Sequence, residues 1–565
     1  MERFWLKNYP SGVPHEIDHH RYESVVQLLE EAFSKYGKRK AYVGLGKELS
    51  FGELDRMSRA LGAWLQNRGL NKGDRVAIMM PNVLQYPVAL AAVLRAGLVV
   101  VNTNPLYTPR ELEHQLKDSG AKAIIILENF ATTLQQVIGR TQVKEVIVAT
   151  MGDMLGFPKG AIVNFVVRTV KKMVPPHQLQ NTVSFKSALA QGERLMLDTP
   201  KIGHEDVAFL QYTGGTTGLA KGATLVHRNI IANILQSEAW LQPALNNPKK
   251  GPPPEQLTWV CALPLYHIFS LTACCLLGMR VGGLNILIPN PRDIPALIKE
   301  IRPYRFNLFP AVNTLFNGLA NNEEFRKLDF SQLRVSLGGG MAVQEAVARQ
   351  WLEVTGCPIC EAYGLSETSP GATANPTDTD AFTGTIGLPF PSTDVAILDD
   401  NGQPVPLGER GEIAIRGPQV MTGYWGHPDE TAKVMTPDGF FKTGDIGIMD
   451  ERGYTKIVDR KKDMILVSGF NVYPNEIEGV VADHPGVLEV AAVGVPDANS
   501  GEAVKLFIVK KDPALTEKDV MAFCAKHLTG YKKPKYVEFR AELPKTNVGK
   551  ILRRELRDEA AKKSS

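Results

Sequence analysis

Helix and strand patterns alternate along the first two-thirds of the chain. Ser50-Phe-Gly-Glu53 has the form of a capping box, and apolar residues at helical spacing follow it. The apolar run Arg75–Met79 predicts a buried strand, and a second capping box at Thr108-Pro-Arg-Glu111 precedes another helix and the strand Ala123–Leu127. The alternation continues past Gly340, so we expect an α/β fold of parallel sheets covered by helices.

The pattern changes twice in the last third of the chain. Between about residues 384 and 459, short apolar runs separated by Gly, Pro and Asp predict a small antiparallel β unit resembling a barrel. After residue 460 the pattern predicts a smaller α+β domain of roughly 100 residues, with a helix at 516–527 and strands at 487–495, 503–509 and 535–539. We therefore expect an N-terminal domain over residues 1–459 and a C-terminal domain over residues 460–565.

One segment between these patterns is amphipathic and basic. Apolar residues recur at helical spacing over residues 162–174, while Arg168, Lys171 and Lys172 face elsewhere, and Pro175-Pro176 end the run. Two interpretations remain open at this stage. Such a helix can lie on an anionic membrane surface, or it can be an ordinary helix packed on the core.

Composition narrows the class of protein. The chain has 565 residues, 44% hydrophobic and 22% charged, as expected for a globular protein of several structural units. A net charge of +4 on this length gives no reason to expect a nucleic-acid partner. Six cysteines argue against a disulfide framework and favour a reducing, cytoplasmic compartment. We expect neither a signal peptide nor a transmembrane helix, because each apolar stretch is interrupted by polar residues or glycines.

The segment Tyr212-Thr-Gly-Gly-Thr-Thr-Gly-Leu-Ala-Lys-Gly222 carries the clearest candidate chemistry. Its glycines allow the backbone to approach a ligand closely, and its amides, threonine hydroxyls and Lys221 can all donate to a polyphosphate. It is not a Walker A loop, because Lys221 is followed by Gly222 rather than by Ser or Thr. A flexible glycine-rich surface loop is the alternative interpretation.

This segment resembles the phosphate loop of the adenylate-forming superfamily, which includes acyl-CoA synthetases, firefly luciferase and peptide-synthetase adenylation domains. Further signatures of that family follow in the expected order: Pro264-Leu-Tyr-His-Ile268, Tyr363-Gly-Leu-Ser-Glu-Thr368, Lys442-Thr-Gly-Asp445, Val458-Asp-Arg-Lys-Lys-Asp463 and Pro544-Lys-Thr-Asn-Val-Gly-Lys550. Residues 438–463 also resemble the fatty-acyl-CoA synthetase signature, with Phe440 where that pattern usually has Trp. The resemblance runs nearly end to end, and the chain looks like the bacterial long-chain fatty-acid–CoA ligases.

The resemblance implies sites for ATP, Mg²⁺ and CoA. Lys550, His267 and Glu367 are the implied catalytic residues, with Glu367 and Thr213 as Mg²⁺ ligands. Tyr363 would stack on adenine, and Asp445 would accept hydrogen bonds from both ribose hydroxyls. Arg460 would bind the ribose or a phosphate, and Gly469 would pass the pantetheine arm. The full set of implied nucleotide and CoA contacts is Thr213, Gly214, Thr216, Thr217, Gly218, Lys221, Gly339, Glu361, Ala362, Tyr363, Gly364, Thr368, Asp445, Arg460, Lys462 and Gly469.

The implied reaction has two steps. A long-chain fatty acid and ATP give acyl-AMP and pyrophosphate, and CoA then displaces AMP, with the C-terminal domain turning about a hinge near Lys462 between the steps. The alternatives are an acyl-AMP ligase that loads a carrier protein, a medium-chain or aryl acid–CoA ligase, and a fatty-acid uptake or binding protein. We expect a cytoplasmic protein associated peripherally with the inner face of the membrane, serving fatty-acid uptake and degradation, and a homodimer is possible.

Overall fold

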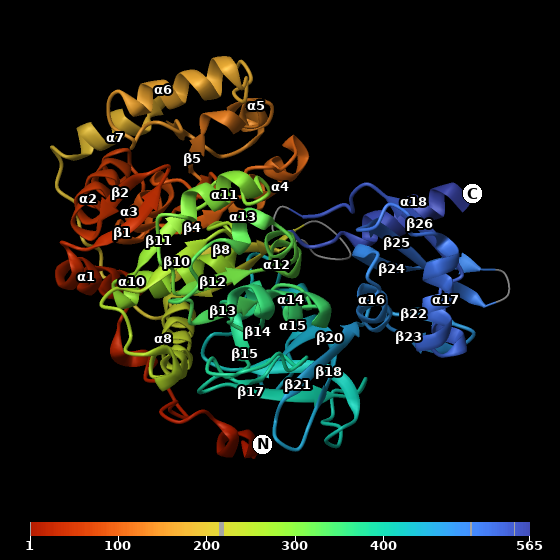
Figure 1. The fold of residues 1–565 in the computed structure, drawn as a ribbon. Coiled ribbons are helices and arrows are strands. Elements are labelled where there is room, and N and C mark those ends of the chain that lie inside the picture. Colours follow the sequence, from red (N-terminus) through yellow and green to blue (C-terminus); the bar gives the residue numbers. More distant parts are fainter. Residues whose placement is uncertain (1, 214–219, 498–499, 547–548, 565) are drawn as a thin grey trace.

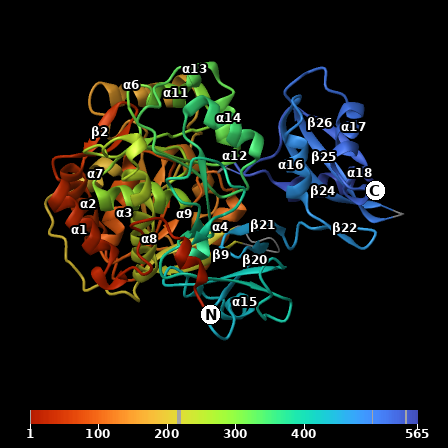
Figure 2. The ribbon, with the colours of Figure 1, turned by 60° about the horizontal axis from the view of Figure 1, so that its bottom comes forward.

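The computed structural model describes residues 2–213, 220–497, 500–546 and 549–564. Gly214, Thr216, Thr217 and Gly218 of the implied phosphate loop lie outside the described residues. Two large sheets and a four-stranded sheet form the larger part of the molecule, and the last hundred residues form a separate small domain to one side (Figure 1, Figure 2).

The first large sheet has eight strands in the order β19-β9-β8-β4-β3-β5-β6-β7. Strand pairing is parallel from β8 through β7 and antiparallel where β9 joins β8 and β19 joins β9. The predicted strands Arg75–Met79 and Ala123–Leu127 are confirmed as β3 and β5. The other members are β4 (Val99–Asn102), β6 (Glu145–Ala149), β7 (Thr182–Ser184), β8 (Val207–Thr213), β9 (Lys221–Val226) and β19 (Gly423–Tyr424).

The second large sheet has nine strands in the order β16-β15-β14-β13-β12-β10-β11-β1-β2, and its middle, from β14 to β1, is parallel. Because carboxyl ends of parallel strands share one edge, β10, β13 and β14 all deliver their following loops to the same side. The strands are β1 (Lys40–Gly44), β2 (Lys47–Ser50), β10 (Thr258–Cys261), β11 (Leu284–Leu287), β12 (Leu308–Ala311), β13 (Val335–Gly338), β14 (Ile359–Gly364), β15 (Gly371–Ala374) and β16 (Leu388–Pro389).

Helices cover both sheets, and the two predicted capping boxes begin two of them. Ser50 caps α2 (Phe51–Asn67), and Thr108 caps α4 (Pro109–Ser119) with Pro at its first position. The remaining helices of this part are α1 (Val25–Tyr36), α3 (Gln85–Arg95), α5 (Ala131–Gln135), α6 (Lys159–Phe165), α7 (Phe185–Gly192), α8 (His227–Leu245), α9 (Ile268–Ser270), α10 (Leu277–Val281), α11 (Ile294–Ile301), α12 (Asn313–Ala320), α13 (Glu323–Arg326), α14 (Glu345–Thr355) and α15 (Pro428–Val434).

The predicted antiparallel β unit is confirmed. Its four strands pair in the order β17-β18-β20-β21, and this path is open rather than closed on itself among the described residues. The strands are β17 (Asp394–Leu398), β18 (Arg410–Arg416), β20 (Phe441–Met449) and β21 (Thr455–Arg460).

The C-terminal part has the predicted α+β character. Its five-stranded sheet contains β22 (Ile465–Val467), β23 (Phe470–Val472), β24 (Val487–Asp497), β25 (Gly501–Lys510) and β26 (Tyr536–Arg540), with helices α16 (Pro474–Ala482), α17 (Glu517–His527) and α18 (Arg553–Ser564). The expected hinge near Lys462 lies between β21 and β22. The boundary between residues 459 and 460 stays a prediction.

The amphipathic segment is helical but does not pack as one stripe. Helix α6 continues into a π-helical turn at Val166–Val170, and Val167 is buried while Ile162 and Val170 are 58% and 64% exposed. Within the described ranges, no helix has the length and apolar character to cross a membrane.

Candidate active site

One cavity of about 2110 Å³ is lined by residues that follow the carboxyl ends of strands of both large sheets, together with residues of the four-stranded sheet and of the C-terminal domain. Most of the implied site residues line it. They are Thr213, Lys221, His267, Gly339, Glu361, Ala362, Tyr363, Gly364, Glu367, Asp445, Arg460, Lys462 and Lys550. Residues from six separate motifs are therefore brought to one place, although up to 337 positions separate them in the sequence.

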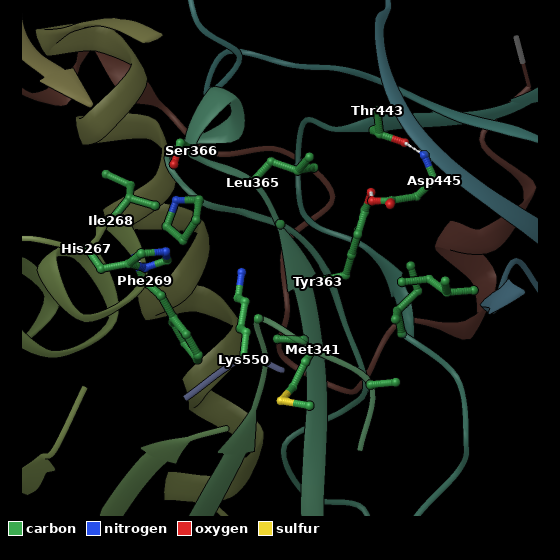
Figure 3. A pocket seen from close by; sticks show the side chains of 18 of the residues that line it. His267, Ile268, Phe269, Met341, Tyr363, Leu365, Ser366, Thr443, Asp445 and Lys550 are labelled. Atoms are coloured by element: carbon green, nitrogen blue, oxygen red, sulfur yellow. Dashed lines mark hydrogen bonds between the residues drawn. The ribbon is translucent and has the colours of Figure 1, made fainter. Parts of the chain in front are cut away.

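Tyr363, Asp445 and Arg460 form a connected polar group on one wall. The Tyr363 hydroxyl donates to Asp445 Oδ2 at 2.6 Å, and Arg460 Nε lies 3.2 Å from Asp445 Oδ1. Strands β20 and β21 place Asp445 and Arg460 opposite each other in register. Thr443 Oγ1 accepts from the Asp445 amide, which fixes the start of this turn (Figure 3).

Lys550 reaches into the middle of the cavity from the C-terminal domain. Its ammonium points into the space between His267 and Tyr363 (Figure 3). A Cβ at Gly340, whose φ is +79°, would lie 3.2 Å from Lys550 Cε, so this glycine leaves room for the lysine chain. Burial, and the nearby Arg460 charge, lower the pKa of Lys550 to about 8.

His267 follows β10 and begins the helix that forms one side of the cavity. Its Nδ1 accepts from the Phe269 amide, which fixes the imidazole at the start of α9. Burial and the charge of Lys550 lower the pKa of His267 to about 3, so the ring is neutral at physiological pH. The Phe269 ring packs against Gly339, where a Cβ would lie 3.0 Å from Cε1.

The opposite wall holds the residues implied for phosphate and metal binding. Glu367 is buried, which raises its pKa, and its Oε1 accepts from the Tyr424 hydroxyl at 2.8 Å. Thr213 ends β8 directly opposite Lys221 on β9. The Lys221 ammonium is paired with Glu430 and lies 5.2 Å from the Tyr424 ring centroid.

Glu361 is the most unusual carboxyl group of the site. Burial raises its pKa to about 8, and its Oε2 has no hydrogen-bond partner among the described residues. It is therefore neutral near pH 7 and able to donate as well as accept.

Among the implied contacts that the structure describes, two do not line the cavity. Thr368 is buried in the turn after β14, where Oγ1 accepts from the Leu365 amide at 2.9 Å, so its visible role is to hold the turn that carries Glu367. Gly469 lies in the hairpin between β22 and β23 with φ +83° and nothing within 4 Å of an added Cβ. It stays a prediction for CoA.

Several residues of the site carried no sequence signal. Tyr424 and Glu430 lie outside the recognised motifs, and so does Thr314, which donates to the Gly549 carbonyl beside Lys550. Their partners are distant in sequence, so neither spacing nor periodicity could have identified them.

The implied metal position at Glu367 offers a carboxylate oxygen from the protein. The described residues contain no group of three or more His, Cys, Asp or Glu side chains suited to a metal ion. A single carboxylate fits Mg²⁺, which is commonly bound by one or two carboxylates together with substrate phosphates and water.

Comparison with known families is consistent with this geometry. The model of the "AMP-binding enzyme" family matches residues 29–425, and that of the "AMP-binding enzyme C-terminal domain" matches residues 476–550.

The chain belongs to the AMP-binding enzyme family.

Relatives and solved structures agree over nearly the whole chain. A long-chain-fatty-acid–CoA ligase of Salmonella typhimurium is 58% identical over 561 residues, 99% of each chain, which confirms the predicted branch of the family. ATP-bound MatB from Rhodopseudomonas palustris has a TM-score of 0.77 at 28% identity, covering 94% of this chain and 98% of its own. The anthranilate CoA ligase AuaEII has a TM-score of 0.84 at 23% identity, covering 96% and 99%, and shows the same fold.

Proposed function

We propose that the protein joins a long-chain fatty acid to CoA in two steps, through an acyl-AMP intermediate formed from ATP. The observation that carries this proposal is the Lys550 ammonium, held between His267 and the Tyr363–Asp445 pair. A carboxylate and a triphosphate repel each other, so a cation already placed at their meeting point lowers the barrier to adenylation.

Each wall of the cavity supplies one part of the substrate site. Tyr363 offers a ring face for adenine, and Asp445 can accept from both ribose hydroxyls, with Arg460 beside it. Thr213 and Lys221 are positioned for the β- and γ-phosphates, and Lys221 leaves Glu430 to reach them. Glu367 and Thr213 would hold Mg²⁺, which supplies charge neutralisation at the phosphates when bound. Lys462 is the proposed hinge and Gly469 the proposed pantetheine contact in the second step.

The apolar part of the cavity supports a long acyl chain. Trp259, Leu308 and Val335 lie in register across β10, β12 and β13, and all line the cavity. Pro310 and Leu337 form a second row two residues nearer the Lys550 end. Because strands rise about 3.3 Å per residue, the distance from Gly339 to Val335 is roughly 13 Å.

A helical segment after His267 also lines the cavity, with lining residues from Ile268 to Leu277. A carbon–carbon bond of about 1.5 Å at an angle near 111° advances an extended chain by about 1.25 Å per carbon. The channel therefore fits roughly ten carbons beyond the reacting end, which favours a fatty acid over the aryl and short-chain alternatives.

Membrane contact is a second part of the proposal, carried by an exposed apolar face on and around α6. Phe157, Ile162, Phe165, Val170 and Met173 are each more than half exposed, whereas Val167 anchors the segment to the protein. Helix α6 lies at the outer edge of the large domain (Figure 1). An exposed apolar helix face with flanking Lys171 and Lys172 suits the surface of an anionic bilayer.

Arg168 does not belong to that contact surface. It pairs with Glu128, which is 4% exposed, at 2.7 Å. Of the three basic residues considered for membrane contact, Arg168 instead forms an ion pair within the protein. Loss of Arg168 would leave the buried Glu128 carboxylate unpaired. With this anchorage, we propose a cytoplasmic protein bound peripherally to the membrane, acting in fatty-acid uptake and degradation.

We expect Lys550→Ala to abolish adenylation while sparing transfer from supplied acyl-AMP to CoA. The ammonium is needed only where two anions meet, and loss of a preorganised cation is worth about 4 kcal/mol, or about a thousandfold in rate. The measurement is pyrophosphate release and, separately, acyl-CoA formation. Lys526→Ala, on the exposed side of α17, is the matched control. Equal loss in both half-reactions would contradict the assigned role.

Adenylation should also depend on pH through the same group. The pKa of Lys550 lies near 8, and the cationic form exists below it, so kcat/KM should be level below about pH 7 and fall above about pH 8. Lys462 has a similarly lowered pKa, so Lys550→Arg is the diagnostic variant. Its guanidinium stays charged, and its residual activity should lose the alkaline fall. A wild-type profile that stays level to pH 10 would exclude Lys550 as the titrating group.

The depth of the channel predicts that substitutions at different depths will set different maximum lengths for the fatty acid. Ala273 and Leu277 both line the cavity, and Ala273 is nearer in the chain to His267 at the reacting end. Ala273→Phe should therefore exclude shorter acids than Leu277→Phe excludes, while both variants keep the shortest acids. Pyrophosphate release across C4 to C18 acids measures both limits. Identical limits, or a uniform loss at all lengths, would show that the acyl chain runs elsewhere.

The exposed apolar face should determine vesicle binding. Replacing Phe157 and Phe165 with Ser should weaken binding to phosphatidylglycerol vesicles about thirtyfold, since burying each side chain contributes at least about 1 kcal/mol. Met196→Ser with Leu407→Ser, two exposed apolar residues elsewhere, is the matched control. Co-sedimentation gives binding, and sedimentation velocity gives the oligomeric state. If only a monomer–dimer equilibrium changes, the face is a homodimer contact instead.

A further inference from the structure

A buried carboxylate joins the two domains next to the expected hinge. Asp459 lies in β21, three residues before Lys462, and its side chain is 0% exposed. Its Oδ2 accepts from the Asn475 amide in the first turn of α16 at 2.8 Å, and its Oδ1 lies 3.4 Å from Arg553 Nη1. Both partners belong to the C-terminal domain, so the contact crosses the hinge.

Arg553 connects this carboxylate to the segment that carries Lys550. It stands three residues after Lys550, at the start of α18, and its Nη2 also binds Glu478 Oε2 at 2.6 Å. Glu478 is itself fixed by the Ala492 amide in β24. Arg553 is thus bound firmly within the C-terminal domain while it reaches Asp459 in the other domain.

Asp459 keeps the Arg460 amide of its own strand in any arrangement, but it has the Asn475 amide and Arg553 only in this arrangement of the domains. Burial raises its pKa to about 6 although Arg553 and two backbone amides favour the charged form. A carboxylate removed from water in this way depends on its cation and amide partners. Rotation about Lys462 would carry α16 and Arg553 away together, because both move with the C-terminal domain.

Further contacts between the domains are neutral or exposed. Thr314 donates to the Gly549 carbonyl and Asn317 to the Leu488 carbonyl, each at 2.9 Å, and both bonds are neutral. Arg292 donates to the Thr546 carbonyl at 3.1 Å in an exposed contact. Arg349 and Asp483 form an exposed pair at 3.5 Å, of the type that contributes little. Among the contacts named here, the one made by Asp459 involves a charged side chain that is fully buried.

We propose that Asp459 is a positioning residue that holds the C-terminal domain in the arrangement that keeps Lys550 inside the cavity. Its bonds to α16 and Arg553 stabilise the adenylation arrangement and must open for the second step. The proposal rests on the proposed two-step function for its kinetic consequence, but not for its conformational one.

Cross-linking tests the conformational consequence. Arg349→Cys and Asp483→Cys place thiols at the exposed edge of the domain contact, and the six native cysteines are all buried. A short bismaleimide should link this pair at least threefold more slowly when Asp459→Asn is added. Glu451→Gln, an exposed charge change in the turn before β21, should leave the rate unchanged. An unchanged rate in Asp459→Asn would overturn the proposal.

Half-reaction kinetics test the role in catalysis. Asp459→Asn should slow adenylation about tenfold and leave transfer from supplied acyl-AMP to CoA unchanged or faster. Arg553→Gln, which removes the partner from the other domain, should act in the same direction. If Asp459→Asn folds poorly, Arg553→Gln alone tests the kinetic role.

A variant that carries both Asp459→Asn and Arg553→Gln tests whether the two residues act together. The two changes remove one shared interaction, so the double variant should lose little more adenylation rate than either single variant. Additive effects, or equal losses in both half-reactions, would overturn the proposal. If the wild-type protein makes no acyl-AMP, the proposed function fails, while the cross-linking result still decides the role of Asp459.

Discussion

The structure depends on keeping the Lys550 ammonium inside a cavity before its anionic partners arrive. Burial and the nearby Arg460 charge disfavour the charged form and lower the pKa of Lys550 to about 8, and no ion pair of its ammonium is found among the described residues. The cost is offset by contacts made elsewhere by the same segment, at Gly549 and Arg553. A cation held without a partner is free to act on a substrate, which a paired one is not.

Local signals predicted local structure well. The strands at Arg75–Met79 and Ala123–Leu127, and the helices capped by Ser50 and Thr108, depend on residues within a few positions of one another. The cavity could be predicted only through the family resemblance, because its walls come from motifs far apart in the chain. Even then, the motif does not specify which way each side chain points, as with Thr368, whose Oγ1 accepts from the Leu365 amide within its own turn.

Contacts between motifs were beyond sequence reasoning altogether. Tyr424 with Glu367, and Asp459 with Arg553, are separated by 57 and 94 residues. The segment at residues 162–174 shows the same limit in another form. Its period identified a helix, but the period alone could not show that Val167 is buried and Ile162 exposed, because that depends on residues elsewhere in the chain.

The pairing of Lys221 with Glu430 has a consequence for how nucleotide binding responds to salt. Glu430 also pairs with Lys433, so it keeps one cation when Lys221 moves to a phosphate. When the triphosphate binds, Lys221 exchanges its ion pair with Glu430 for one with a phosphate. No new ion pair is formed from two charges that were both solvated before. Fewer free counterions are displaced in such an exchange, so the basic residues around the cavity overstate how strongly ionic strength controls affinity for the triphosphate.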